Sequence, residues 1–192
     1  MLYLVRHGRT AHNASRRLLG RLDVPLDDLG RRQAAALGQV PALHGAHRVI
    51  TSPLTRARDT AAALGPPVTE DERWAEIDYG IYDGLQLEEA ADLWRGWGTD
   101  LAYTPEGGES LADVGVRVRD ACADLWPEVV EQDIVVVTHV SPLKAAVAWA
   151  LGVGDDISWR MFVDVASISV VGSGRSGPSL RTFNETHHRP SE

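Results

Sequence analysis

Four uninterrupted apolar residues, Ile134 to Val137, restrict the fold more than any other segment. Such a run predicts a strand buried on both faces, as in the centre of a helix-covered parallel sheet. Residues 2–5 form a second run and residues 49–50 a weaker one, while residues 167–171 and 180–183 are typical of two strands joined by a Gly/Ser-rich turn. Helical segments alternate with these strands, so we predict an α/β fold: a three-layer sandwich with a mostly parallel central sheet flanked by helices.

Four segments carry the start signals of helices. Ser and Asp side chains can accept hydrogen bonds from the free N–H groups of a first turn, and Pro fits its first position. Pro127 lies inside the third segment, where it is expected to end or kink the helix. The predicted helices are residues 29–37 after Asp27 and Asp28, residues 54–64 after Ser52 and Pro53, residues 114–130 after Ser110 and Asp113, and a last helix from Ser141 and Pro142 through Trp149.

The composition restricts the class of partner. Lys and Arg number 19 against 27 Asp and Glu, a formal net charge of -8. This charge argues against a general nucleic-acid binder and against attraction to anionic membranes, although clustered arginines can still bind a small anion. No stretch approaches the roughly 20 apolar residues of a membrane span, and charge follows the start too soon for a signal peptide. With Cys122 as the one cysteine, a cytoplasmic location is expected.

Residues 85–108 are the least regular part of the chain. They carry Trp94 and Trp97 among acidic clusters and end in Gly107 and Gly108. A long, weakly patterned segment is typical of a lid or binding loop. The alternative is a surface excursion whose tryptophans fill gaps in the core. Since the sequence shows no repeat and no linker, we expect one domain over residues 1–192, with a lid or insertion at about 85–108.

Two histidines follow the two clearest strands. His7 comes directly after residues 2–5, and His139 comes just after Val137. Ligands of α/β sheets bind at the carboxyl ends of the strands, where Arg6 and, from the start of the next helix, Arg56 can join them. A cation at a helix start is unfavourable unless an anion binds nearby. Two arginines and two histidines, with no cysteine or carboxylate set for a metal, predict a phosphate pocket.

A series of motifs in a fixed order adds to this prediction. Alone, the segment Arg6-His7-Gly8 is weak, but the ordered set is specific. The motifs are Leu4-Val5-Arg6-His7-Gly8-Arg9-Thr10 with Asn13, then Pro25-Leu26 with Leu29-Gly30 and Gln33, then Thr51-Ser52-Pro53-Leu54-Thr55-Arg56-Ala57, then Glu76-Ile77-Asp78-Tyr79-Gly80-Ile81-Tyr82-Asp83-Gly84, and last Gly107-Gly108-Glu109-Ser110 and Val137-Thr138-His139. Over nearly the whole chain this set resembles the histidine phosphatase superfamily with its phosphoglycerate mutase-like fold, and it is similar to the phosphatase branch, including α-ribazole phosphatase and actinobacterial acid phosphatases.

The resemblance implies a two-step phosphoryl transfer without a metal or another cofactor. His7 would be the nucleophile that forms a phosphohistidine, and Glu76 would donate a proton to the leaving oxygen. The resemblance also implies the groups that bind the phosphoryl group, which are Arg6, His7, Asn13, Arg56 and His139.

Each of these residues has a structural alternative. Arg6 and His7 could form a solvated turn, and His139 could be a satisfied core histidine. Arg56 could belong to an exposed helix face, as Arg58 does in our interpretation. The acidic stretch around Glu76 could instead be a solvated loop. In that case Asp78 is the substitute to test for the role given to Glu76.

Three departures from the family pattern concern the substrate rather than the chemistry. Arg9 adds positive charge at the pocket mouth, Val140 replaces a common glycine and Asp83 replaces a common glutamate. Residues 85–108 and side chains at the mouth, with Arg9, Arg21, Trp94 and Trp97 as candidates, would set specificity. Arg21 could bind a second anionic group, but an ordinary surface arginine is the preferred interpretation.

The preferred function is a phosphomonoesterase that acts on a small phosphorylated metabolite. A mutase needs additional segments that cover the site, and the short chain favours access of water. A cofactor-dependent phosphoglycerate mutase is the first alternative, and an inactive phospho-ligand-binding member is the second. The oligomeric state stays open, with a homodimer as one option.

Overall fold

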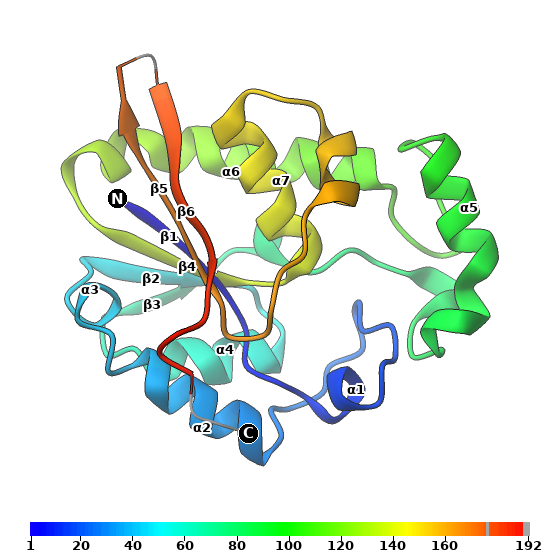
Figure 1. Cartoon of the computed structure of the whole chain (residues 1–192), viewed down its shortest axis with the longest axis horizontal. Helices are drawn as coiled ribbons and strands as arrows, with labels where there is room; N and C mark the ends of the chain where they lie inside the picture. Colours follow the sequence, from blue (N-terminus) through cyan, green and yellow to red (C-terminus); the bar gives the residue numbers. More distant parts are fainter. Residues whose placement is uncertain (176, 190–192) are drawn as a thin grey trace.

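The computed structural model describes residues 1–175 and 177–189, and a six-stranded sheet runs through its centre (Figure 1). The strand order is β3-β2-β4-β1-β5-β6. β1, β4, β2 and β3 pair in parallel, whereas β5 pairs antiparallel with both β1 and β6. The predicted mostly parallel sheet is therefore mixed, with its antiparallel part at one edge. The strands are β1 (Leu2–Arg6), β2 (Arg48–Thr51), β3 (Val68–Glu70), β4 (Ile134–Thr138), β5 (Ile168–Gly174) and β6 (Gly177–Glu185).

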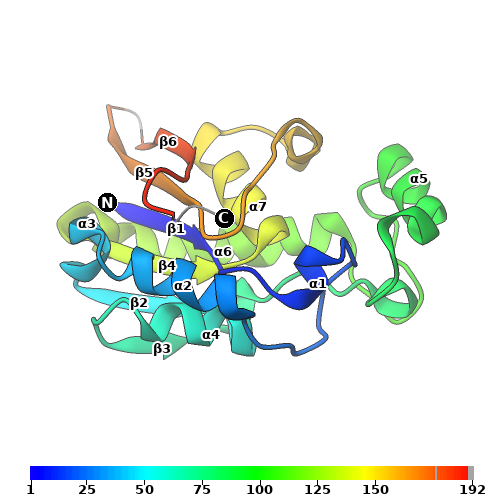
Figure 2. The ribbon, with the colours of Figure 1, turned by 60° about the horizontal axis from the view of Figure 1, so that its bottom comes forward.

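Helices cover both faces of this sheet, which confirms the three-layer prediction (Figure 2). β4 is buried along its whole length, and its alternating side chains enter two separate cores. Val135 and Val137 pack with α2, α3 and α4, whereas Ile134 and Val136 pack with α6 and α7. The helices are α1 (Ala11–Ala14), α2 (Asp28–Leu37), α3 (Pro41–His44), α4 (Thr55–Ala62), α5 (Ala91–Thr99), α6 (Leu111–Glu131) and α7 (Val140–Leu151), and the short 3₁₀ helices are η1 (Glu72–Trp74), η2 (Gly80–Tyr82), η3 (Leu87–Ala90) and η4 (Asp155–Arg160).

Two predicted helix starts agree with the structure. Asp27 caps α2 by accepting a hydrogen bond from the Gly30 N–H at 2.8 Å. Ser110 and Asp113 form a reciprocal capping box at the start of α6. Both are local contacts within one turn, which explains why the sequence alone predicts them.

Three other helix predictions were wrong in detail. α4 begins at Thr55 rather than at Leu54, because the Leu54 backbone is extended (φ -73°, ψ 136°), although the Ser52 Oγ does accept the Leu54 N–H at 3.3 Å. α7 begins at Val140, one residue before Ser141, and a glutamate from another segment binds its first N–H groups. Pro127 does not end α6, since buried side chains on both sides of it hold the helix in the core.

Residues 85–108 contain η3 and α5, which stand beyond the end of the sheet (Figures 1 and 2). Trp97 is buried, and its Nε1–H donates to the Tyr103 carbonyl at 2.8 Å. For Trp97 the structure thus favours the gap-filling alternative. Trp94 is only partly buried and faces a cavity that is described below. In the described part of the chain, no helix is both long and apolar enough to cross a bilayer.

Candidate active site

His7 and His139 leave the sheet side by side. Arg6 and Thr138 are the last paired residues of β1 and β4, and the next N–H, that of His7, donates to the Thr138 carbonyl at 3.0 Å. The two imidazole ring centroids are 5.0 Å apart. The parallel register of two adjacent strands therefore brings together two residues that lie far apart in the sequence.

The His7 ring is buried and held in one tautomer. Its Nδ1–H donates to the Gly8 carbonyl at 2.7 Å, which leaves the lone pair on Nε2. Burial, and then the charges of Arg56 and Arg6, hold the pKa of His7 well below its ordinary value. The imidazole is consequently neutral at neutral pH, as a nucleophile requires.

His139 lies at the N-terminus of α7 and is also fully buried. Its Nε2 is 2.7 Å from Ser52 Oγ, and the Ser52 oxygen accepts the Leu54 N–H at 3.3 Å. The serine hydroxyl can therefore donate to Nε2, which places the ring proton on Nδ1. This Nδ1 has no hydrogen-bond partner among the described residues. Burial and the charge of Arg56 hold the pKa of His139 well below its ordinary value.

Arg56, in the first turn of α4, is completely buried. Its Nη1 donates to the Leu22 carbonyl at 2.9 Å and its Nη2 to the Gly20 carbonyl at 2.7 Å, while Nε has no partner in the described part. Burial lowers the pKa of Arg56 to about 10, so the guanidinium stays charged at neutral pH. The exposed-face alternative is wrong for Arg56, whereas Arg58 is indeed exposed.

The loop that holds Arg56 is itself held by Asp83. The Asp83 Oδ1 accepts from the Gly20 N–H at 2.7 Å, and its Oδ2 accepts from the N–H groups of Arg21 and Leu22, each at 2.8 Å. Sequence reasoning missed this contact and noted Asp83 only as a departure from the family pattern. The carboxylate thus positions the carbonyls that orient the Arg56 guanidinium.

Arg6 and Asn13 line the cavity beside His7. The Arg6 Nη1 donates to the Val163 carbonyl at 2.6 Å, and burial lowers the pKa of this arginine. The Asn13 Oδ1 accepts from the backbone N–H of Thr10 at 3.1 Å. Because its oxygen is engaged in this way, the Asn13 amide presents its Nδ2–H groups as donors.

Glu76 is buried at the start of α7 and also lines the cavity. Its Oε2 accepts from the Val140 N–H at 3.0 Å, and its Oε1 accepts from the Ser141 N–H at 3.1 Å. The solvated-loop alternative is therefore wrong for Glu76. Asp78, the substitute considered from the sequence, instead accepts the Gly80 N–H at 2.9 Å and does not line the cavity.

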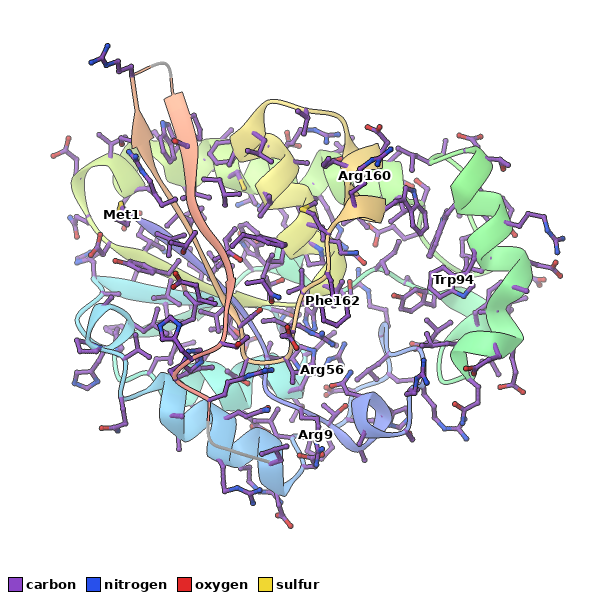
Figure 3. All side chains as sticks on the ribbon, in the orientation of Figure 1. Met1, Arg9, Arg56, Trp94, Arg160 and Phe162 are labelled. Atoms are coloured by element: carbon purple, nitrogen blue, oxygen red, sulfur yellow. The ribbon has the colours of Figure 1, made fainter. Side chains whose placement is uncertain are left out.

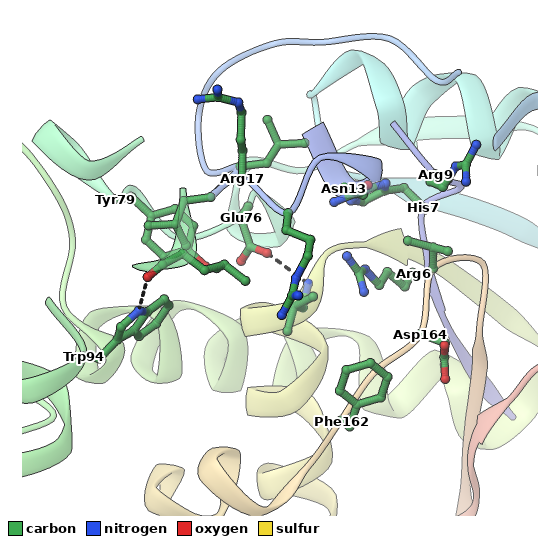
Figure 4. Close-up of a pocket in the computed structure, with 16 residues that line it drawn as sticks. Arg6, His7, Arg9, Asn13, Arg17, Glu76, Tyr79, Trp94, Phe162 and Asp164 are labelled. Atoms are coloured by element: carbon green, nitrogen blue, oxygen red, sulfur yellow. Dashed lines mark hydrogen bonds between the residues drawn. The ribbon is translucent and has the colours of Figure 1, made fainter. Parts of the chain in front are cut away.

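A cavity of about 470 Å³ opens over His7, and Figures 3 and 4 show its surroundings. Of the mouth residues considered from the sequence, Trp94 and Arg9 line it, although the Arg9 Nε is bound to Asp27 at 2.8 Å. Arg21 and Trp97 do not line it. Cavity residues that the sequence analysis missed include Arg16, Arg17, Tyr79, Phe162 and Asp164.

The structure thus brings the candidate residues together at one edge of the sheet. Four of them line the cavity: Arg6, His7, Asn13 and Glu76. The other two are fully buried behind these residues. Arg56 is close enough to lower the pKa of His7, and the His139 ring contacts the His7 ring. Within the described residues, no cluster of three His, Cys, Asp or Glu side chains is arranged to hold a metal ion. Such a set of cationic and neutral donors suits a phosphoryl group.

Comparisons with known proteins show which proteins this chain is similar to. The family model described as "Histidine phosphatase superfamily (branch 1)" matches residues 2–186. A glucosyl-3-phosphoglycerate phosphatase of Mycolicibacterium vanbaalenii is 35% identical, with 88% of this chain and 82% of that protein covered. Phosphoserine phosphatase 1 of Hydrogenobacter thermophilus is 33% identical, with 97% of this chain and 93% of that protein covered.

A solved structure and a longer relative complete the comparison. The phosphoserine phosphatase of Entamoeba histolytica, in a complex with phosphoserine, superposes with a TM-score of 0.89 at 25% identity, covering 97% of this chain and 98% of that one. A bifunctional protein of Mycobacterium tuberculosis is 37% identical over 96% of this chain, but this chain spans only 54% of that protein. The chain therefore covers about half the length of the first curated relatives it matches.

Proposed function

The chain belongs to the histidine phosphatase superfamily, and on that basis we propose that it is a metal-independent phosphomonoesterase that hydrolyses a small organic phosphate through a phosphohistidine on His7. The observation that carries the proposal is the buried, neutral imidazole of His7, with Nδ1 fixed by Gly8 and two arginines close by. Relatives with phosphatase names support the reaction class.

In the first step, the lone pair of His7 Nε2 attacks phosphorus, and the bond between phosphorus and the leaving oxygen breaks. Glu76 gives its proton to that oxygen, so the alcohol leaves neutral. The negative charge on the equatorial oxygens is balanced by Arg6, Arg56 and the donors of the site. These groups are held by backbone carbonyls and need little reorganisation.

In the second step, the Glu76 carboxylate accepts a proton from water, whose oxygen attacks phosphorus. The bond between phosphorus and Nε2 then breaks and returns the electron pair to His7. Inorganic phosphate forms, Glu76 is protonated again and the cycle closes. His139 can donate from Nδ1 to a phosphoryl oxygen in both steps, because this atom has no partner in the described protein.

Hydrolysis of p-nitrophenyl phosphate tests the proposal. We expect turnover that survives EDTA and is lost in His7→Ala, together with an acid-labile phosphoenzyme that the same variant does not form. Glu76→Gln should lower kcat by about 10²–10⁴-fold. Activity that depends on added metal, or a His7→Ala variant that remains active, would contradict the mechanism. Transfer from 2,3-bisphosphoglycerate to monophosphoglycerate that outpaces hydrolysis would instead indicate the mutase.

A further inference from the structure

Phe162 is an exposed aromatic residue in the wall of the cavity (Figure 4). This residue is 73% exposed, the largest value among the exposed large hydrophobic residues of the described chain. Its backbone is nevertheless well anchored, since the next residue, Val163, is buried and its carbonyl accepts the Arg6 Nη1–H. The phenyl ring is thus held in water beside a phosphate-binding arginine, where a ligand ring could cover it.

Trp94 supplies a second aromatic surface from α5. Its Nε1–H donates to the Leu87 carbonyl at 3.1 Å, so the one polar atom of the indole is already satisfied. Its ring packs against Trp97 and Tyr79, with centroid distances of 6.0 Å and 6.5 Å. These contacts fix the indole, and the surface that it presents to the cavity is apolar.

The cavity has room for more than a phosphoryl group. Its volume of about 470 Å³ lies within the usual range of about 300–1,000 Å³ for small-molecule sites. Leu87 and Val140 add to the apolar lining of the cavity. At the mouth, Arg9 is paired with Asp27, and Arg17 donates to the Gly84 carbonyl. These two guanidinium groups are therefore already engaged, whereas Arg16, which also lines the cavity, makes no such side-chain contact with the described residues.

From these contacts we infer that the leaving alcohol of the substrate carries a planar, apolar ring system, and that Trp94 and Phe162 bind this ring. The inference rests on the proposed function, because the phosphoryl group at His7 places the rest of the ester in the cavity. It narrows the substrate class to ring-bearing phosphomonoesters such as nucleoside 5′-monophosphates. Small phosphorylated carboxylic acids would lack the group that these aromatic residues contact.

Two esters that differ only in the ring provide the first test. Adenosine 5′-monophosphate and ribose 5-phosphate share the phosphorylated ribose, so their ratio of kcat/KM isolates the ring. We expect the nucleotide to be favoured by about tenfold or more, since stacking of a base on an aromatic side chain has an effect of that size. Phe162→Ala should move the ratio toward one. A ratio near one in the unchanged protein would overturn the inference.

Trp159→Ala is the matched control. Trp159 is 49% exposed and lies three residues before Phe162 in the same segment, but it does not line the cavity. Its loss should leave the ratio unchanged. An equal fall of the ratio in this variant would show that the segment's conformation, rather than contact with the Phe162 ring, sets the preference, and would overturn the inference.

Two further measurements separate this inference from the proposed function. If ribose 5-phosphate is hydrolysed without any preference for the nucleotide, the inference fails and the phosphatase stands. If neither ester is hydrolysed and p-nitrophenyl phosphate is not hydrolysed either, the phosphatase proposal fails, and calorimetric binding of adenosine 5′-monophosphate against ribose 5-phosphate decides the inference by the same expected ratio. A preference for 3-phosphoglycerate over the nucleotide would overturn it in favour of an anion at Arg16.

Discussion

Acid should destabilise this fold through its two active-site histidines, before carboxylates with ordinary pKa values titrate. His7 and His139 are buried and neutral in the folded protein, and their pKa values lie well below the ordinary 6.5. In the unfolded chain both imidazoles regain ordinary values and bind protons below about pH 6.5. Stability is therefore fully present above that pH and is lost as the pH falls from about 6.5 toward the folded pKa values.

The size of the effect follows from the number of protons that the unfolded state gains. One pH unit below 6.5, each histidine can favour the unfolded chain by at most about 1.4 kcal/mol. Both together predict a loss of up to about 3 kcal/mol in the free energy of unfolding between pH 7.5 and pH 5.5. This is a large fraction of the 5–15 kcal/mol that is typical of folded proteins.

Urea denaturation at the two pH values, in a buffer without phosphate, measures this loss directly. The variant His7→Asn removes one of the two titrating rings, so about half of the loss should remain. Equal unfolding free energies at pH 7.5 and pH 5.5 would refute the conclusion that both imidazoles are buried and neutral in the folded protein. The same conclusion would follow if His7→Asn lost as much stability as the unchanged protein.

Three substitutions test the contacts that support the site. Asp83→Ala removes the acceptor of three loop N–H groups. We therefore expect the free energy of unfolding to fall by about 3 kcal/mol and kcat/KM to fall about 100-fold. An unchanged kcat/KM would show that Asp83 does not position Arg56. Ser52→Ala leaves the His139 Nε2 without its partner and should lower kcat about tenfold, as measured with p-nitrophenyl phosphate. Gly30→Ala places a Cβ 1.9 Å from the Arg9 carbonyl oxygen and should lower stability by about 2 kcal/mol or more in thermal unfolding.

Five of the six strands could be predicted from the sequence because they contain short apolar segments, whereas β3 was missed because its three residues, Val68 to Glu70, are exposed and form no apolar run. The central strand at residues 134–138 is buried throughout, and the predicted core side chains lie there. The errors arose where a side chain has a distant partner. Ser52 contacts the distant His139 as well as the Leu54 N–H, and Pro127 is tolerated because core packing holds α6. The helix propensity of the local sequence predicts neither the contact of Ser52 nor the tolerance of Pro127.

The location of the site could also be predicted, because both histidines follow strands that end at the same sheet edge. The contacts that support the site could not be predicted from the sequence. Asp83 and the loop at residues 20–22 are 61 to 63 residues apart in the chain, and their meeting depends on the complete fold. The same holds for Phe162, which no motif distinguishes from a core aromatic residue. The catalytic roles of the site residues stay predictions until the variants are measured.

The pairing of Arg6 with Thr138 makes the proposed hydrolysis a sensitive reporter of strand alignment. Successive side chains of a strand point to opposite faces, so a shift of β4 by a single residue would turn the imidazole of His139 away from that of His7. The uniformly apolar β4 could still be buried after such a shift, and spectroscopic measures of sheet content would change little. Selection for turnover in a library of β1 and β4 sequences would therefore recover correctly aligned sheets that stability screens alone do not distinguish.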